Sequence, residues 1–355
     1  MGMHWLRLGF LAGLVSANSY AANITFSTFV TAGDINAAET QNATIGFTFA
    51  GDKFVGTVYL GTNNRQLYST DLNGGNVQLF GTALPNSVPS GEIVLAGSLG
   101  QGGFAAGTVY AGGGSDVYKY AATGGAPTLF ASGLVGDLRG LLFDPGSSFG
   151  GNLLAATTAG NIYRIDSSGT PTLLANTGED TEGMDIIPVG ATGWGAYGGY
   201  LVTASEGSGA MRLISPTGTI IATGINIPSF ETINFIPEDI GLSGNPLEGY
   251  YAANYPVNIQ KADAAQFKNQ NLGGHLLGTS EDGSNARVWD VTYNSGTNSF
   301  SVAQYSGNLP NQAEDGIFVT AQRINDVSSP EPGSLLLMGC GLAAVLWARR
   351  RTLHA

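Results

Sequence analysis

Acidic side chains that could bind a cation recur along the chain at nearly constant spacing. They precede short apolar runs at Glu92, Asp137, Glu182, Glu231 and the pair Glu314-Asp315. If these runs are the innermost strands of a repeated unit, the carboxylates meet at one place. Converging carboxylates repel one another unless they are neutralised, and a hard divalent cation such as Ca²⁺ does this with oxygen ligands. We therefore consider Asp137, Glu182 and Glu231 candidate ligands of Ca²⁺ or another divalent cation.

The same acidic residues have a simpler interpretation, which stays open at this point. They could form a solvated rim in which each carboxylate accepts hydrogen bonds from turn amides. No further cofactor is indicated by the sequence.

Other kinds of chemistry have few residues available. The chain has a single cysteine, Cys340, and three histidines, of which only His275 is far from the ends. This excludes disulfides and cysteine-based metal sites from the main body, and it leaves little material for serine–histidine catalysis or a multi-histidine zinc site. The formal net charge of −12 disfavours nucleic acid as a partner, because phosphate backbones would be repelled. Cations, neutral glycans and other proteins fit this charge better.

Four stretches repeat one pattern of three short apolar runs separated by glycine-rich turns. β-Branched and aromatic residues in such runs are typical of strands joined by hairpins. The four copies are Gly56–Gly81, Gly107–Gly133, Gly151–Asn176 and Gly199–Gly224. Each copy follows one more apolar run, which would make a four-stranded antiparallel unit: Ile45–Ala50, Ile93–Ala96, Leu138–Phe143 and Met184–Pro188. Aligned positions are 45 or 50 residues apart, as Tyr68, Tyr118, Tyr163 and Leu213 show.

A four-stranded unit repeated at this length predicts an all-β fold of the β-propeller type. One such sheet cannot bury both of its faces, so the copies must stack around an axis. We expect six blades, with five or seven as alternatives. Two sandwich domains are the alternative all-β architecture, although that fold would not require a fixed repeat.

The last two blades are expected to be less regular. The fifth blade is predicted to contain Ile233–Pro237, Tyr250–Ala253, Asn258–Ala262 and His275–Gly278. The sixth is predicted to contain Ala286–Tyr293, Ser299–Tyr305 and Gly316–Gln322, closed by the N-terminal strand Asn23–Thr31. Closure by both ends of the chain would remove the open sheet edge.

Aromatic residues are abundant and have two possible uses. Tyrosines at repeated strand positions are expected to pack between blades. Trp194 differs, because it falls in a glycine-rich insertion, Gly190–Gly199. An insertion outside the repeat could contact a ligand such as a carbohydrate.

The two ends of the chain have the character of targeting segments. Residues 1–21 form a predicted signal peptide, with Arg7 before the apolar helix Leu8–Val15 and small residues at Ser19-Tyr20-Ala21. The propeller is expected over 22–326. Residues 327–355 form a separate segment in which Ser334–Ala348 is uncharged and apolar. We predict that this stretch is a transmembrane helix, although it is short for a bilayer, and that the following arginines stay in the cytoplasm.

The C-terminal segment resembles the PEP-CTERM sorting signal of Gram-negative bacteria. Its three parts stand in order: Pro330-Glu331-Pro332, the apolar stretch, and Arg349-Arg350-Arg351. The resemblance implies recognition by an exosortase, transient membrane insertion, removal of the tail, and delivery to the cell surface or the extracellular polymer matrix. A permanent C-terminal membrane anchor is the alternative.

The repeat resembles the blades of NHL and SMP-30/gluconolactonase propellers. The resemblance lies in Thr181-Glu182-Gly183 and in Phe143-Asp144-Pro145. In the lactonases an acidic residue of such a Glu-Gly element holds the catalytic metal, so a metal-dependent hydrolase or lactonase is one hypothesis for function. The scarcity of catalytic residues favours the other hypothesis, a binding or structural protein without catalysis. The resemblance of the tail to the sorting signal implies that this protein is exported to the cell surface or extracellular matrix, where its partners would be exopolysaccharide or surface proteins.

Overall fold

The computed structural model describes residues 23–40, 43–59, 66–85, 88–281 and 286–328. The predicted signal peptide and the apolar and arginine-rich parts of the C-terminal segment lie outside these residues. Among the helices that the structure describes, none has the length and apolar character needed to cross a membrane.

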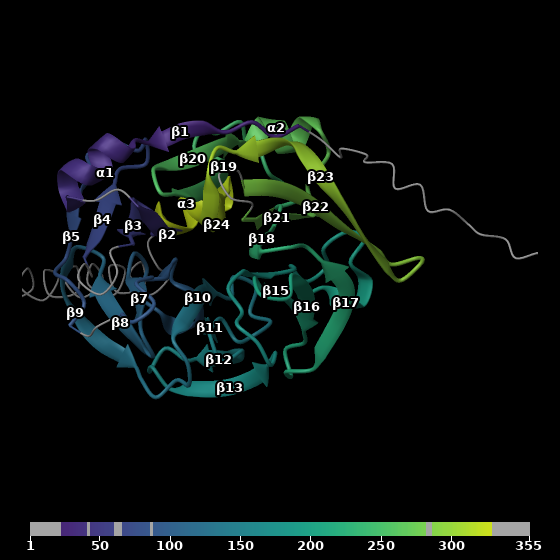
Figure 1. The fold of residues 1–355 in the computed structure, drawn as a ribbon, viewed down its shortest axis with the longest axis horizontal. Coiled ribbons are helices and arrows are strands. Elements are labelled where there is room, and N and C mark those ends of the chain that lie inside the picture. The colour runs from purple at the N-terminus through teal and green to yellow at the C-terminus, as the bar shows by residue number, and fades with distance from the viewer. Residues whose placement is uncertain (1–22, 41–42, 60–65, 86–87, 282–285, 329–355) are drawn as a thin grey trace, which may run out of the picture.

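Six four-stranded antiparallel sheets form the blades of a propeller (Figure 1). The first four blades have consecutive strands joined by hairpins, as the repeat predicts. Blade 1 contains β2 (Thr44–Phe49), β3 (Phe54–Val58), β4 (Leu67–Thr70) and β5 (Gln78–Phe80). Blade 2 contains β6 (Leu95–Gly97), β7 (Val109–Gly113), β8 (Asp116–Ala121) and β9 (Gly124–Ala131). Blade 3 contains β10 (Leu138–Phe143), β11 (Leu153–Thr157), β12 (Asn161–Ile165) and β13 (Pro171–Asn176). Blade 4 contains β14 (Met184–Ile186), β15 (Leu201–Ala204), β16 (Ala210–Ile214) and β17 (Ile220–Asn226).

Blades 5 and 6 are interleaved in sequence. Blade 5 has the order β18-β21-β22-β23, built from β18 (Phe230–Phe235), β21 (Leu276–Ser280), β22 (Ala286–Asn294) and β23 (Ser299–Leu309). Blade 6 has the order β24-β19-β20-β1, built from β24 (Gln312–Val319), β19 (Gly249–Tyr255), β20 (Asn258–Asp263) and β1 (Ser27–Val30). The chain therefore leaves blade 5 after one strand, makes two strands of blade 6, and then returns.

The predicted composition of these two blades is wrong in one respect. Tyr250–Ala253 and Asn258–Ala262 were expected beside Ile233–Pro237, but they belong to blade 6, whereas the hairpin around 295–298 belongs to blade 5. The apolar pattern locates a strand and its buried face, but it carries no information about which distant strand becomes its neighbour.

Both ends of the propeller chain meet in blade 6 and close the ring. The N-terminal β1 pairs with β20 at the outer edge, where Ser27 faces Lys261 and Thr28 faces Gln260. The C-terminal β24 pairs with β19 at the inner edge. In Figure 1 the purple β1 accordingly lies beside the green β20, although the two strands are far apart in the sequence. The predicted closure by strands from both ends is confirmed.

Short helices lie outside the sheets. They are α1 (Ala32–Glu39), α2 (Ala264–Asn269), α3 (Ala321–Ser328) and the 3₁₀ turns η1 (Gln101–Gly103) and η2 (Gly195–Tyr197). The helix α1 is capped by Thr31, whose side chain accepts a hydrogen bond from the Asp34 amide. Such a cap satisfies an amide that would otherwise lack a partner.

The core lies between blades and not within any one blade. The described residues form six hydrophobic clusters, one between each pair of neighbouring blades. The recurring Tyr68, Tyr110 and Tyr118 are buried in them, as predicted. Trp194 is also buried, at 1% exposure, and its Nε1 donates a hydrogen bond of 2.7 Å to the Gly274 carbonyl. The expectation that Trp194 could contact a ligand is therefore wrong, because the insertion folds back onto blade 5.

Truncation of the closure core should be costly. Phe54 is 1% exposed and packs against Phe29 of β1 and Tyr251 of β19. We expect Phe54→Ala to lower the free energy of unfolding by about 3–5 kcal/mol, because a large cavity remains. Leu129→Ala, at a position 58% exposed, is the control and should change it by no more than about 0.5 kcal/mol. Urea unfolding followed by intrinsic fluorescence measures both, and equal midpoints would contradict the prediction.

Candidate functional site

The innermost strands of the six blades surround a central channel. The strands β2, β6, β10, β14, β18 and β24 contact one another in a closed succession. Residues at or near the starts of these strands line a small cavity of about 60 Å³, which includes Arg139, Glu182, Glu231 and Glu314. Residues at their ends line a larger cavity of about 1110 Å³. We call the end of the channel that holds the small cavity the acidic mouth. We call the larger cavity, at the opposite end, the strand-end cavity.

The strands approach one another closely at the acidic mouth. A Cβ at Gly140 would lie 2.5 Å from the carbonyl oxygen of Glu182, and one at Gly183 would lie 2.6 Å from that of Glu231. Each glycine therefore lets one inner strand pack against the next. Because Gly183 directly follows Glu182, the Glu-Gly pair noted in the sequence has a structural reason: the glycine allows contact and the glutamate enters the mouth.

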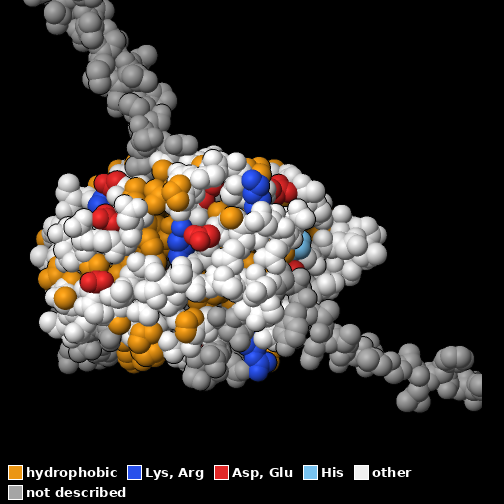
Figure 2. Space-filling model, turned by 90° about the horizontal axis from the view of Figure 1, so that it is seen from above, with side chains coloured by type: hydrophobic (Ala, Val, Ile, Leu, Met, Phe, Trp, Pro, Cys, Tyr) orange, Lys and Arg blue, Asp and Glu red, His pale blue; other side chains and the backbone are white. Residues whose placement is uncertain are grey.

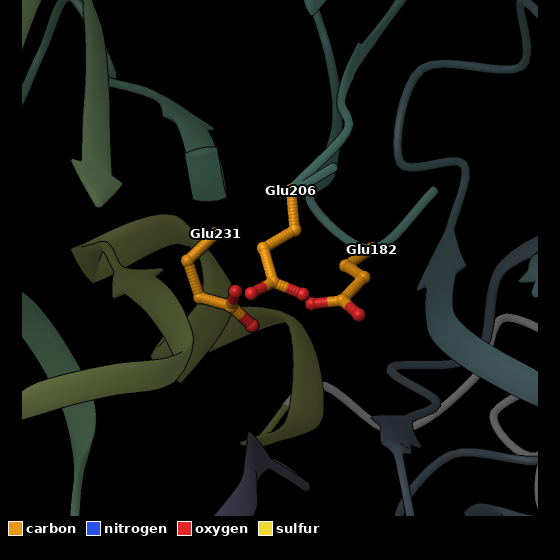
Figure 3. A group of neighbouring side chains, drawn as sticks. All are labelled: Glu182, Glu206 and Glu231. Atoms are coloured by element: carbon orange, nitrogen blue, oxygen red, sulfur yellow. The ribbon is translucent and has the colours of Figure 1, made fainter. Parts of the chain in front are cut away.

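Three carboxylates converge at the acidic mouth. Oxygen atoms of Glu182, Glu206 and Glu231 all lie within 4.8 Å of one another. In Figure 3 the Glu206 carboxylate lies between the other two and all three point inward. They come from the segment before β14, the turn after β15, and β18. The structure thus brings together two of the predicted ligands, Glu182 and Glu231, and adds Glu206.

The third predicted ligand, Asp137, is not part of this group among the described residues. It precedes β10, and its main chain is tied to Thr158: the Asp137 amide donates to the Thr158 hydroxyl at 3.0 Å, and the Thr158 amide donates to the Asp137 carbonyl at 2.9 Å. The side chain that enters the channel from this blade belongs to Arg139, two residues later.

Arg139 is the cation of the acidic mouth. Its guanidinium forms ion pairs with Glu92 and Glu182, and its Nε lies 3.4 Å from Asp180 Oδ2. Its Nη2 lies 4.0 Å from Glu206 Oε2. One arginine of blade 3 therefore interacts with carboxylates of both neighbouring blades, 2 and 4. No pattern in the sequence indicates this role of Arg139.

Two further carboxylates complete the acidic mouth. Glu281 directly follows β21, the second strand of blade 5, and it shares a hydrogen bond with Glu314 of β24. Glu206 stands in the same way after β15, the second strand of blade 4. An acidic residue just past a second strand is the sequence signal for both, because an antiparallel second strand returns the chain to the mouth from which the first strand started.

Burial and crowding change the acidity of these groups. The pKa of Glu231 is raised well above its ordinary value, first by burial and then by the charges of Glu314 and Glu281, while Arg139 opposes the shift. Burial, followed by the charge of Glu281, raises the pKa of Glu314 to about 8. Burial, followed by the charge of Glu206, also raises the pKa of Glu281.

The negative charge of Glu231 is the least neutralised by neighbouring groups among the three clustered glutamates. It is 5% exposed, and within the described part of the chain its carboxylate has neither a hydrogen-bond donor nor an ion-pair partner. A buried carboxylate of this kind keeps a proton or takes up another cation. Chemically, the acidic mouth can therefore exchange protons near neutral pH or bind a divalent cation through oxygen ligands.

One outer face of the molecule can be compared with the acidic mouth in Figure 2. The face seen in Figure 2 carries scattered acidic and basic side chains among polar and apolar ones. This face therefore shows no cluster of acidic side chains comparable to the one at the acidic mouth.

Stability without added metal should fall as pH rises. The Glu314 pKa is about 8 in the folded protein and 4.5 ordinarily, so between these values the folded state holds a proton that the unfolded state has lost. Stability then decreases with pH across this range. We expect the melting temperature in EDTA to be lower at pH 8 than at pH 5, and Glu314→Gln to reduce this difference. An unchanged difference in the variant would contradict the assignment.

Removal of the central cation should destabilise the ring. Arg139→Met leaves the buried Glu182 and its acidic neighbours at the mouth without their counter-charge. We expect a loss of about 3 kcal/mol or more in unfolding free energy. Arg212→Met, which breaks the more exposed ion pair with Glu179, serves as control and should cost about 1 kcal/mol or less. Denaturant unfolding at pH 7 compares the two, and similar losses would show that Arg139 has no special role.

Comparisons with known proteins identify one family feature. The family profile described as the PEP-CTERM protein-sorting motif matches residues 330–351. No curated protein matches the chain. The described structure is similar to a streptogramin B lyase, with 13% identity, coverage of 81% of this chain and 76% of the other, and a TM-score of 0.46.

Other solved structures give comparable values. A catalytically inactive virginiamycin B lyase from Staphylococcus aureus with quinupristin has 12% identity, 80% and 75% coverage, and a TM-score of 0.48. A protein of unknown function from Bacteroides thetaiotaomicron has 11% identity, 82% and 66% coverage, and a TM-score of 0.49. Likeness at this level carries no argument about activity, so the propeller assignment rests on the sheet topology.

The motif match agrees with the sequence of the tail. It begins at Pro330-Glu331-Pro332 and ends with Arg349-Arg350-Arg351. Such a motif implies export, processing by an exosortase and sorting to the surface. The chain is a six-bladed β-propeller that carries a C-terminal PEP-CTERM protein-sorting motif.

Proposed function

We propose that this surface-sorted propeller is a binding or matrix protein that holds a divalent cation such as Ca²⁺ at its acidic mouth. The observation that carries the proposal is the buried Glu231 carboxylate, which lies within 4.8 Å of Glu182 and Glu206 and forms no ion pair of its own among the described residues. A bound cation would replace the proton that this carboxylate otherwise retains.

The three glutamates supply oxygen ligands of the kind that Ca²⁺ binds, and they leave some of its coordination positions unfilled. Ca²⁺ takes about 6–8 oxygen ligands, and Glu182, Glu206 and Glu231 offer one oxygen each within the common distance. Glu182 already pairs with Arg139 through one of its oxygens, so its other oxygen is the one available. The remaining places would be filled by water or by oxygen atoms of a partner, such as the hydroxyl and carboxylate groups of a polysaccharide.

An extracellular location fits such a site. Extracellular calcium modules bind with dissociation constants of about 10⁻⁴–10⁻³ M, and three carboxylates that share Arg139 would give affinity in that range. The partners we propose are exopolysaccharide or surface proteins in the matrix of a Gram-negative bacterium. Before processing, the apolar stretch 334–348 would insert into the membrane and Arg349 to Arg351 would remain in the cytoplasm.

Ca²⁺ binding should depend on the clustered glutamates and not on Asp137. Titration of the metal-free protein with Ca²⁺ at pH 8, followed by calorimetry, should give one site, and Ca²⁺ should raise the melting temperature. Glu231→Gln should abolish both effects because it removes the uncompensated ligand. Asp137→Asn should preserve them, since Asp137 lies outside the cluster. Equal binding by Glu231→Gln and the unmodified protein would refute the site, as would no binding by either.

A metal-dependent hydrolase or lactonase is the second candidate function. The observation in its favour is that Glu281 and Glu314 lie beside the cation cluster and have raised pKa values, so that either carboxyl could exchange a proton there. A general base needs a pKa near the working pH. We expect no Ca²⁺-dependent hydrolysis of simple lactones by the protein. Hydrolysis that is lost in Glu281→Gln, while Ca²⁺ binding is kept, would establish the enzyme and displace the binding role.

A further inference from the structure

The last described element of the chain covers the end of the channel opposite the acidic mouth. Helix α3 follows β24, the innermost strand of blade 6, with Thr320 between them. Thr320, Gln322 and Arg323 line the strand-end cavity. The segment that leads to the sorting motif therefore leaves the propeller at this cavity and not at the acidic mouth.

Hydrogen bonds hold the first turn of helix α3 in place. The amide of Ala321 donates to Glu248 Oε1 at 2.9 Å, and the amide of Arg323 donates to the Thr320 hydroxyl at 3.3 Å. Glu248 is itself buried and also accepts from the Ser243 hydroxyl at 2.6 Å. Glu248, held in place by Ser243, and the preceding Thr320 thus fix the first turn of the helix.

Arg323 adds a link from α3 to the channel wall. Its Nη1 donates to the Phe318 carbonyl at 2.9 Å, and the partly buried Asp185 of β14 is the nearby charge that opposes the lowering of its pKa by burial. Asp185 accepts a hydrogen bond of 2.8 Å from the Phe235 amide of blade 5. Ile324 packs in the hydrophobic cluster between blades 6 and 1. The helix is therefore part of the propeller and not a free tether.

The chain between α3 and the apolar stretch is short. The helix ends at Ser328 and the apolar stretch begins at Ser334, so the two are at most about 20 Å apart even when fully extended. An inner strand of six residues such as β10 spans about 20 Å, which is the approximate distance between the two ends of the channel. A tether of this length cannot pass around the ring to the other face.

We propose that the strand-end face lies against the membrane while the precursor is inserted, so that the acidic mouth points away from the bilayer. This inference rests on the membrane insertion proposed above. The partner of the strand-end face is the bilayer surface, and the cation cluster remains accessible from outside before the tail is removed. Ligand binding at the acidic mouth then does not depend on processing.

Two exposed valines give a matched test of this orientation. Val189 follows β14 on the strand-end side, lines that cavity and is 72% exposed; Val135 precedes β10 on the acidic side and is 61% exposed. Full-length precursors with Cys340→Ala and either Val189→Cys or Val135→Cys are labelled with a fluorophore. They are then reconstituted in phosphatidylcholine–phosphatidylglycerol vesicles that contain a headgroup-linked quencher.

The expected result is that the label at 189 loses most of its fluorescence and the label at 135 keeps it. A flexible Gly-Ser insertion after Ser328 should remove the difference, because the propeller can then turn. Equal quenching at both positions, or stronger quenching at 135, would overturn the orientation while leaving membrane insertion established. Protein that fails to float with the vesicles would overturn insertion and orientation together, whereas Ca²⁺ binding by the same preparation would still test the cation site.

Discussion

The free inner edge of every blade is the constraint on which this propeller depends. An innermost strand has no strand partner on its channel side, and backbone amides left there without acceptors would be costly. Side chains of the neighbouring blade accept from several of them. Asp315 accepts from the Phe47 amide at 2.9 Å, and Thr48 accepts from the Gly97 amide at 3.0 Å. These bonds join blade to blade, so they satisfy the edge and close the ring at once.

This constraint explains why acidic side chains enter the channel and why they divide into two groups. Successive residues of a strand point to opposite sides. The Asp315 carboxylate accepts hydrogen bonds from the Phe47 amide of blade 1 and from the Gly316 amide, whereas the preceding Glu314 lines the cavity at the acidic mouth. Burial raises the pKa of Asp315 to about 7 even though two amides donate to it. The channel therefore combines structural carboxylates with others that have no comparable backbone role.

The parts that could be predicted from sequence are those set by local pattern. Glycine turns and apolar runs define the first four blades, and the spacing of Glu182 and Glu231 predicts that their side chains converge. Non-local pairing is different, because nothing in the 249–263 hairpin indicates that it joins β24 instead of β18. The role of Arg139 was equally hidden, since a single basic residue acquires it only when carboxylates of other blades surround it.

The interleaved order of blades 5 and 6 has a consequence for how the molecule is assembled and how it bears load. During folding blade 6 cannot be completed before β24 is available, because it lacks its inner strand until this final segment of the ring has joined. Tension applied to the sorting tail would enter through α3 into β24, which pairs along its length with β19 and contacts the inner strands of both neighbouring blades. The tail thus pulls on the hub of the ring, where separation requires several strands to yield together.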